Sequence, residues 1–466
     1  GDARYLAAAY ALVALVFGAV YIAVTPPAGV GDEPMHFERI YEVSSGQLLG
    51  AVGLPKGDAA FIDQAYDKLR SRTPYRDKDL SALRSIATDN SAENAYRNPL
   101  RKVMRIHHPV AYAPYAPAIA LRSGLDLSPY QYLISLRLSN LVISIAMVAF
   151  AISIAPLGRA PLALLALTPT TLSYFGGVNI DGFLVGASFL FIAVVSRLLL
   201  TKSGEASRRI NTQTSLLLSA LLFFIGSIKA PYVAIGLLAL AGRRAQYELP
   251  GGRAAAAAII LTPALVSALT WAFVVKTMML EGLSYSTDGG DLVNSSAQMA
   301  HLFGRPSEVF SVFSRTMINA DFLSGTLLEM VGQLVWSATW TPFLINAIVL
   351  FSLCMLIFGQ EAPVGQNAFT VSFPPLFRPV SALVFLAVTS ATLFFLYLQW
   401  TGVGAEKIAG FQGRYVIPVF PLVIFAVPKV LSVVPRGGGA GLSALLMGAA
   451  ALYGGYGTLS SYFYGM

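Results

Sequence analysis

The chain has 466 residues and a formal net charge of +8, with 55% hydrophobic and only 12% charged residues, and its mean hydropathy is +0.64. A soluble globular domain carries about 25% charged residues, so the composition excludes a soluble chain and indicates a membrane protein. In a soluble protein the positive charge would suggest nucleic acid as a partner, but in a membrane protein it is typical of basic loops beside anionic lipid. We therefore expect membrane lipid, and no nucleic acid, as a partner.

The hydrophobic residues form runs long enough for membrane helices, because about 20 apolar residues cross the hydrocarbon core. From these runs we predict a single all-α polytopic domain over 1–466 with about eleven transmembrane helices. The expected spans are about 5–24, 131–155, 161–175, 182–200, 213–228, 231–242, 254–275, 342–359, 379–399, 413–434 and 440–460. We interpret 5–24 as a retained span, since no clear small-residue cleavage site of a signal peptide follows it. Two points stay open: residues 229–231 separate two spans or kink one helix, and 327–340 is a candidate re-entrant stretch.

Basic residues assign the orientation of these spans, because short inner loops carry an excess of lysine and arginine. With the N-terminus inside, the basic residues of the inner loops are Arg159, Lys202, Arg208, Arg209, Arg243, Arg244, Arg253, Arg378, Lys429 and Arg436. Two long segments, residues 25–130 and 276–325, then fall outside. We expect the first of them to form short amphipathic helices on the membrane surface.

The unusual polar groups of the chain all fall on the outer side in this topology. They are Asp32, Glu33 and His36 after the first span, Arg137 in the second, Asn179 and Asp181 before the fourth, Lys229 after the fifth, and Gln412, Arg414 and Tyr415 around the start of the tenth. Other residues set the orientation, so this agreement supports one polar site. Ionisable groups at membrane depth cost about 2.5–3.5 kcal/mol on insertion scales and usually serve a function.

The residue types in this group predict acid–base chemistry beside a phosphate. One of the carboxylates of Asp32 and Glu33, shielded from water, can act as a general base, which typically contributes about 10²- to 10⁴-fold in rate. Arg414 and Lys229 are suited to bind the phosphate of a lipid head group that arrives through the bilayer. Together they fit the transfer of a group from a lipid phosphate to a hydroxyl.

Each group also has a purely structural interpretation. The adjacent carboxylates after the first span can form a solvated helix cap, and Asn179 with Asp181 can form an Asx turn and an N-cap. Lys229 can extend its ammonium group to the membrane interface, and Arg414 can anchor the chain there. The sequence alone leaves both interpretations open.

Metal and nucleotide chemistry find little support in the sequence. His36, His107 and His108 lack an H-x-H or H-x-x-x-H spacing, so we interpret them as surface or core histidines rather than metal ligands. Asp288 and Asp291 are interpreted as part of a turn. The chain contains no P-loop or dinucleotide motif, so a nucleotide-sugar donor has no visible site. We expect no cofactor and no metal site, while help from a divalent metal stays open.

Four stretches of the sequence match a known pattern in order. They are GDEPMHFERIYEVSSGQLL at 31–49, HHPVAYAPYAPAIAL at 107–121 followed by Arg137-Leu-Ser-Asn, LTPTTLSYFGGVNIDGF at 167–183, and GFQGRYVIPVFPL at 410–422. The first resembles the P-D-E-P-x-H-F start, and the last the G-x-Q-G-R-Y-x-x-P ending, of a widespread bacterial membrane family, domain of unknown function 2142. The resemblance covers about 25–435, with Gly31 where that family often has proline.

That family is similar in layout to the GT-C glycosyltransferases, polytopic enzymes that use polyprenyl-phosphate-linked sugars and carry an acidic motif in the first outer loop. The resemblance implies a GT-C-like bundle in a bacterial inner membrane, with 25–130 and 276–325 as periplasmic loops. It implies Asp32 as the catalytic base, with Glu33 as its neighbour or substitute. It also places the remaining polar residues: Lys229 and Arg414 near the lipid phosphate, and His36, Asn179 and Asp181 around the sugar or acceptor. We expect a second set to bind substrate as well: Arg137, His107, His108, Gln412 and Tyr415.

We therefore expect an enzyme that moves a sugar from a polyprenyl-phosphate donor to a glycan, lipid or cell-wall acceptor at the periplasmic face. Two alternatives stay open. One is a flippase or transporter for a lipid-linked glycan, and the other is a polymerase or ligase that uses a lipid-diphosphate oligosaccharide. Transporters tend to carry internal repeats and charges near the midplane, and we find neither in the sequence.

Overall fold

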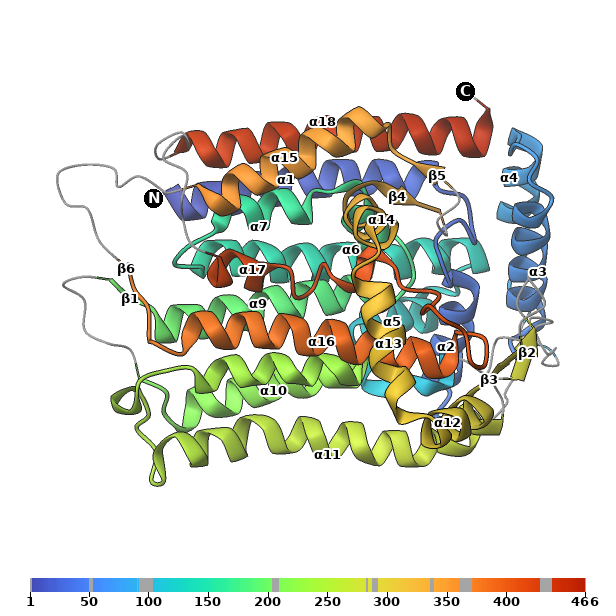
Figure 1. Cartoon of the computed structure of the whole chain (residues 1–466). Coiled ribbons are helices and arrows are strands. Elements are labelled where there is room, and N and C mark those ends of the chain that lie inside the picture. The colour runs from blue at the N-terminus through green and yellow to red at the C-terminus, as the bar shows by residue number, and fades with distance from the viewer. Residues whose placement is uncertain are drawn as a thin grey trace.

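The structure is a computed structural model, and it describes residues 2–49, 53–89, 91, 104–202, 209–281, 284–286, 292–335, 339–359, 371–427 and 438–465. Regular structure in these residues is almost entirely helical, and Figure 1 shows the long helices side by side along one direction. The strands pair in three short antiparallel ladders: β1 (Thr201–Lys202) with β6 (Val371–Ser372), β2 (Ser284–Ser286) with β3 (Leu292–Asn294), and β4 (Gln333–Leu334) with β5 (Thr339–Trp340). The turn expected at Asp288–Asp291 and three of the basic residues, Arg208, Lys429 and Arg436, lie outside the described residues.

Six helices of the described chain are long and apolar enough to cross a membrane. They are α1 (Asp2–Val24), α6 (Pro129–Ile154), α9 (Asp181–Leu199), α11 (Gly252–Glu281), α16 (Phe377–Gln399) and α18 (Gly438–Tyr464). Three other apolar helices are shorter: α10 (Thr212–Ile228), the 3₁₀ helix η3 (Ala230–Leu240) and α15 (Phe343–Phe358). An all-α membrane protein with several spans is therefore confirmed, whereas the expected number of eleven spans is not.

Two expected spans are not continuous helices. Residues 161–175 divide into α7 (Arg159–Ala166) and α8 (Pro169–Phe175), because Pro169 has no N–H to continue the first helix and the side chain of Thr168 accepts from the Thr171 amide to start the second. In the expected span 413–434, the described residues form η5 (Gly413–Tyr415) and α17 (Pro421–Ala426). The candidate re-entrant stretch is the end of α14 (Ala320–Gly332) followed by β4 and β5.

The chain reverses direction between α10 and η3, and the two are not one kinked helix. The backbone of Ile210, just before α10, forms two hydrogen bonds with the segment after η3. Its amide donates to the Gln246 carbonyl over 2.6 Å, and its carbonyl accepts from the Glu248 amide over 2.9 Å. The start of α10 and the end of η3, near the short η4 (Arg244–Gln246), therefore lie together. Lys229 consequently lies at the opposite end of the bundle from Ile210.

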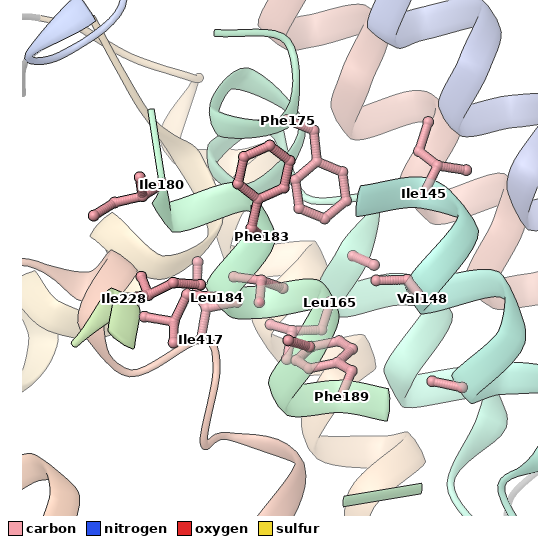
Figure 2. Packing of buried hydrophobic residues seen from close by; sticks show 14 of the residues in the cluster. Ile145, Val148, Leu165, Phe175, Ile180, Phe183, Leu184, Phe189, Ile228 and Ile417 are labelled. Carbon is pink, nitrogen blue, oxygen red and sulfur yellow. The ribbon is translucent and has the colours of Figure 1, made fainter. Parts of the chain in front are cut away.

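The core of the bundle surrounds α9, whose spanning window is 78% buried. Figure 2 shows Phe183, Leu184 and Phe189 of α9 packed among apolar side chains of neighbouring segments: Ile145 and Val148 of α6, Leu165 of α7, Ile228 of α10, and Ile417. Small residues on α9 permit the close approach to α6, because a Cβ at Gly186 would lie 2.8 Å from the Met147 side chain. This central position places the first residue of α9, Asp181, in the middle of one end of the bundle.

Short helices gather at the end of the bundle where α1, α11 and α16 finish. Those after α1 are α2 (Glu33–Ser44), α3 (Lys56–Arg70), α4 (Asp77–Arg84), η2 (Pro109–Tyr115) and α5 (Ala116–Leu125), and those after α11 are α12 (Ser295–Gly304) and α13 (Pro306–Met317). Figure 1 shows α2, α3, α4 and α12 on the right, while β1 and β6 lie on the left. The two long connecting segments thus meet at the same end as Asp181.

Candidate functional site

A cavity of about 380 Å³ opens at this end of the bundle. Nine residues singled out from the sequence line it: Asp32, His36, His107, His108, Asp181, Lys229, Gln412, Arg414 and Tyr415. They come from segments that are far apart in the chain, namely the start of α2, the residues before η2, the start of α9, the turn after α10, and η5. The structure therefore brings most of the predicted polar groups into one place.

Arg414 lies among the charged side chains of the cavity. Its Nη1 donates to the Tyr174 hydroxyl over 2.8 Å and lies 3.4 Å from Asp181 Oδ2, while its Nη2 lies 3.6 Å from Asp32 Oδ2. Lys229 Nζ donates to Asp181 Oδ1 over 2.5 Å and lies 4.6 Å from the ring centre of Tyr415. Two cations thus face two carboxylates, and the arginine–carboxylate contacts are longer than the usual 2.7–2.9 Å, so an anionic ligand can compete for the guanidinium.

The backbone of Asp32 adopts a left-handed conformation, with φ 62° and ψ 5°. For a residue with a side chain this conformation costs about 1–2 kcal/mol, and Asp and Asn tolerate it best. Asp32 occupies the N-cap position of α2, but its side chain makes no capping hydrogen bond to the first residues of that helix. The helix-cap interpretation is therefore wrong for Asp32, whose carboxylate instead lines the cavity with 28% of its surface exposed. Strained backbone of this kind concentrates at functional sites.

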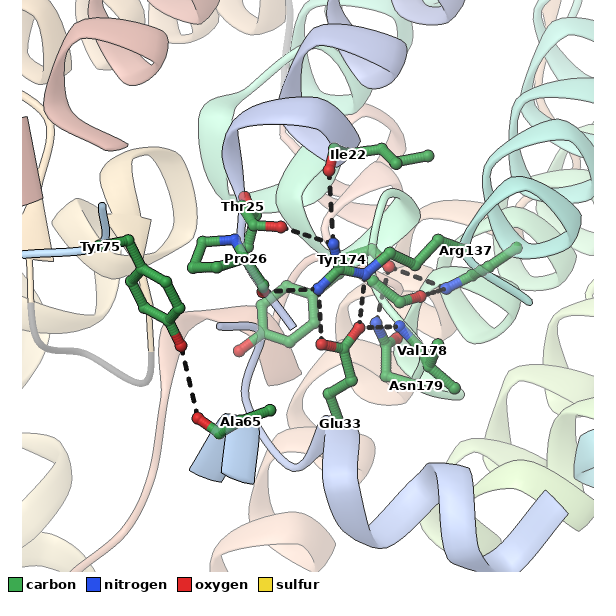
Figure 3. A network of polar contacts seen from close by, with 12 residues as sticks. Ile22, Thr25, Pro26, Glu33, Ala65, Tyr75, Arg137, Tyr174, Val178 and Asn179 are labelled. Carbon is green, nitrogen blue, oxygen red and sulfur yellow. Dashed lines mark hydrogen bonds and ion pairs between the residues drawn. The ribbon is translucent and has the colours of Figure 1, made fainter. Parts of the chain in front are cut away.

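Glu33 and Arg137 form a buried ion pair beside the cavity, and neither is among the residues that line it. Figure 3 shows two guanidinium nitrogens of Arg137 facing the carboxylate of Glu33. The Arg137 Nε donates to Glu33 Oε1 over 2.8 Å, and Nη2 donates to Oε2 over 2.6 Å. Arg137 also donates to the carbonyls of Thr25 and Pro26, and Glu33 accepts from the Val178 amide. The pair thus fixes the loop before Asp32 to the segment before Asp181, so we assign to both residues a positioning role.

Asn179 and Asp181 have different roles, although they are two residues apart. The Asn179 side-chain oxygen accepts from the Gly182 amide over 3.1 Å, and its nitrogen donates to the Tyr174 carbonyl over 2.7 Å. This hydrogen bond agrees with the Asx-type turn of the structural interpretation, but the N-cap position of α9 is occupied by Ile180 and by neither Asn179 nor Asp181. Asn179 is buried without lining the cavity. Asp181 instead directs its carboxylate to Lys229 and Arg414.

Neutral histidines cover another side of the cavity. Burial lowers the pKa of His36 and the pKa of His107 to about 3, so both rings are uncharged at neutral pH. His36 Nδ1 lies 2.9 Å from the Tyr112 hydroxyl, and the rings of His36 and His107 stack with centres 6.1 Å apart. Arg105, two residues before His107, pairs with the buried Glu42 of α2, and this ion pair holds the histidine segment against α2.

A contact that was not predicted from the sequence positions Arg414. The chain at Gly413 crosses the last turn of α14 so closely that a Cβ there would overlap the Met330 amide and the Thr326 carbonyl. The Gly413 amide donates to Glu329 Oε2 over 2.7 Å, and the Thr170 hydroxyl donates to the Glu329 carbonyl over 2.9 Å. Only the glycine of the G-x-Q-G-R-Y motif could have signalled such a close approach. We assign Glu329 as a positioning residue for the turn that carries Arg414.

Replacing Glu329 by alanine is expected to speed amide hydrogen exchange across 410–416, because the Gly413 amide loses its acceptor. Glu329→Gln should retain slow exchange, since its amide oxygen can still accept. Hydrogen–deuterium exchange measured by mass spectrometry on the purified protein checks this. Glu308→Ala serves as the control, because Glu308 pairs with Arg305 and His301 away from the cavity. Equal exchange in Glu329→Ala and the native protein would contradict the assignment.

The remaining wall of the cavity is largely apolar and comes from two of the membrane-spanning helices. Ala268, Trp271 and Val275 of α11 line one side, and Phe395 and Leu396 of α16 line another. On α11 these residues are three or four positions apart, so they share one face, while Phe395 and Leu396 are neighbours on α16. A charged end and an apolar wall thus belong to the same cavity, a combination that suits an amphiphilic ligand.

These features define an α-helical membrane protein with a cavity at one end of its bundle that combines charged groups and an apolar wall. The chain matches a family model described as predicted membrane protein (DUF2142) over residues 15–423. It therefore belongs to the domain of unknown function 2142 family. Neither the curated proteins nor the solved structures gave a match.

Proposed function

We propose that the protein is a glycosyltransferase that moves a sugar from a polyprenyl-phosphate carrier to a hydroxyl of a glycan, lipid or cell-wall acceptor. The observation that carries the proposal is the shared cavity in which Asp32, Asp181, Lys229 and Arg414 lie beside an apolar wall. In this proposal the membrane is the bacterial inner membrane, and the cavity opens at the periplasmic face. The GT-C resemblance of the acidic motif after the first span supports this assignment.

Arg414 and Lys229 would hold the phosphate of the donor. The Arg414 Nε is buried and has no hydrogen-bond partner among the described residues, while the contacts of Nη1 and Nη2 with carboxylates are long. A planar guanidinium binds phosphate through two parallel hydrogen bonds, and an ammonium group adds a mobile point charge. Two cations balanced by two carboxylates suit the single charge of a lipid phosphodiester better than the larger charge of a diphosphate.

The apolar wall would hold the first part of the carrier chain. α11 and α16 present large apolar side chains to the surroundings as well as to the cavity, since Leu269 and Phe273 of α11 and Leu386 of α16 are exposed. In a spanning helix such residues face lipid. A carrier chain in the bilayer can therefore reach the phosphate site beside helices that already contact lipid, which favours a lipid-linked donor over a soluble one.

Asp32 would act as the general base of the transfer. Its carboxylate would accept the proton of the acceptor hydroxyl while the hydroxyl oxygen forms a bond to the anomeric carbon of the sugar. The bond between that carbon and the phosphate oxygen breaks, and polyprenyl phosphate leaves with the bonding electron pair. Arg414 and Lys229 stabilise the charge that develops on this oxygen. The proposed reaction requires no cofactor.

Transfer of label from synthetic donors tests the proposal. Purified protein in liposomes is given undecaprenyl phosphate carrying radiolabelled glucose, mannose or galactose, with a bacterial envelope extract as the acceptor. We expect labelled product from at least one donor, and its loss in the variant Lys229→Gln/Arg414→Gln. Arg315→Gln is the matched control, because Arg315 is exposed and pairs only loosely with Glu406 over 3.5 Å.

Other outcomes identify the alternatives. Movement of a labelled lipid-linked glycan across the liposome membrane, with no product formed, would overturn the enzyme assignment in favour of a flippase. Long products made only from a lipid-diphosphate oligosaccharide would replace it with a polymerase or ligase.

A further inference from the structure

One side of the cavity carries hydrogen-bonding groups but no charge. It is formed by His107 and His108 before η2, Ser227 in the last turn of α10, and Ser267 and Trp271 on α11, all of which line the cavity. We refer to these five residues as the neutral subsite. The charged residues Asp32, Asp181, Lys229 and Arg414 do not belong to it.

The two serines have unused hydrogen-bonding capacity. The Oγ atoms of Ser227 and Ser267 are buried and lack a hydrogen-bond partner among the described residues. A buried hydroxyl without a partner costs about 1–3 kcal/mol, and native proteins usually avoid this cost. Rotation about χ1 changes the direction of each serine hydroxyl. Both hydroxyls can therefore form a hydrogen bond with a ligand in the cavity that these serines line.

The two histidines present one donor and one acceptor. His108 Nδ1 accepts from the Val110 amide over 3.2 Å, so the neutral ring carries its proton on Nε2. His107 Nδ1 lies 3.2 Å from the Ile228 carbonyl, which can only accept, so this neutral ring carries its proton on Nδ1 and leaves Nε2 as an acceptor. Burial lowers the pKa of both rings, which keeps them neutral at ordinary pH.

An aromatic side chain completes the neutral subsite. The Trp271 Nε1 donates to the Ile106 carbonyl over 2.8 Å, and the rings of His108 and Trp271 meet edge to face with centres 4.9 Å apart. Trp271 and Ser267 are four residues apart on α11 and therefore share a face. The indole is thus fixed beside a hydroxyl, and its apolar surface belongs to the same part of the cavity.

We propose that the neutral subsite binds an uncharged sugar through its hydroxyl groups, with Ser227, Ser267, His107 and His108 as hydrogen-bonding partners and Trp271 against an apolar face of the ring. A sugar offers neighbouring hydroxyls that both donate and accept, and its C–H groups form apolar patches that pack on aromatic rings. A phosphate or carboxylate would find no cation among these five residues. The inference rests on the proposed function, because it assigns the sugar of the donor to the subsite and leaves the phosphate to Arg414 and Lys229.

Binding of two lipids to the purified protein separates the subsite from the phosphate site. The probes are radiolabelled undecaprenyl phosphate and the same lipid carrying glucose, mannose or galactose. We expect at least one sugar-bearing lipid to bind more tightly than the bare lipid phosphate. The variant Ser227→Ala/Ser267→Ala should lose about tenfold in affinity for that sugar-bearing lipid, as two modest hydrogen bonds disappear, while its affinity for the bare lipid phosphate stays unchanged.

A third serine provides the matched control. Ser215, also on α10, is fully buried with an unpartnered hydroxyl but does not line the cavity, so Ser215→Ala should leave both affinities unchanged. Removing unpartnered hydroxyls should not lower the melting temperature of any of these variants. Unchanged binding of the sugar-bearing lipid in the double variant would overturn the neutral subsite but not the proposed function. Failure of the native protein to bind either lipid would overturn the lipid-phosphate donor and the subsite with it.

Discussion

Replacing Asp32 by asparagine is expected to lower the rate of sugar transfer about 10²- to 10⁴-fold, the usual contribution of a general base. The carboxylate has no capping role in the described structure and lines the cavity 3.6 Å from Arg414, so its loss removes a proton acceptor and one long contact with Arg414 but no capping hydrogen bond. Asparagine tolerates the left-handed backbone at φ 62° as well as aspartate does. The folded protein should therefore retain its stability, and single-turnover transfer rates measure the chemical effect alone.

A second left-handed aspartate supplies the control for this substitution. Asp126 has φ 45°, is exposed at the end of α5 and does not line the cavity. Asp126→Asn removes one carboxylate at a comparable backbone position and should leave the rate unchanged. Asp32→Ala is less informative, because alanine adds backbone strain at φ 62° to the loss of the carboxylate. Full transfer activity in Asp32→Asn would rule out this residue as the base.

The meeting of charged groups at one end of the bundle was predictable from the sequence. In the topology expected from the sequence, basic residues such as Arg159 and Arg253 mark one end of the helices, and spans alternate in direction. Asp181 and Lys229 therefore have to lie at the other end, whatever the details of packing. Arg414 can meet Asp32 at this end only if the chain reverses after Lys229, and the structure contains that reversal.

The different roles of neighbouring residues were not predictable from the sequence. Asp32 and Glu33 carry similar side chains, but the left-handed turn at Asp32 points the two carboxylates to different places. Glu33 meets Arg137, which is 104 residues away in the chain, and no local pattern signals such a pairing. The same holds for Glu329 and Gly413, which are brought together by the crossing of α14 and η5. Tertiary contacts decide these roles.

The number of membrane-spanning helices was also not predictable from the hydrophobic runs of the sequence. A run of apolar residues shows that a segment is suited to lipid or to a protein core, but it does not show that the helix is continuous. The run around Thr168 is interrupted because that residue starts a new helix, and most of α7 and α8 is buried within the bundle. Hydropathy cannot distinguish such buried segments from full spans.

Replacing Arg137 by methionine is expected to destabilise the protein by about 3–5 kcal/mol, the cost of leaving one member of a buried ion pair without its partner. The Arg137 and Glu33 side chains are 1% and 0% exposed, so water cannot replace the lost partner. The carbonyls of Thr25 and Pro26 would lose their donor in the same substitution. Glu33→Gln should also be costly, because it leaves the guanidinium charge buried and unbalanced.

Unfolding of the purified protein by sodium dodecyl sulfate in mixed micelles measures the change in the free energy of unfolding. Arg315→Met is the matched control, since Arg315 and Glu406 are 53% and 83% exposed and an exposed ion pair contributes less than about 1 kcal/mol. If Arg137→Met cost no more than Arg315→Met, the ion pair would not hold the loop before Asp32. The expected loss of stability in Arg137→Met would replace the substrate-binding role predicted for Arg137 with a structural role. In that role the residue acts on the cavity only through the chain segments that it joins.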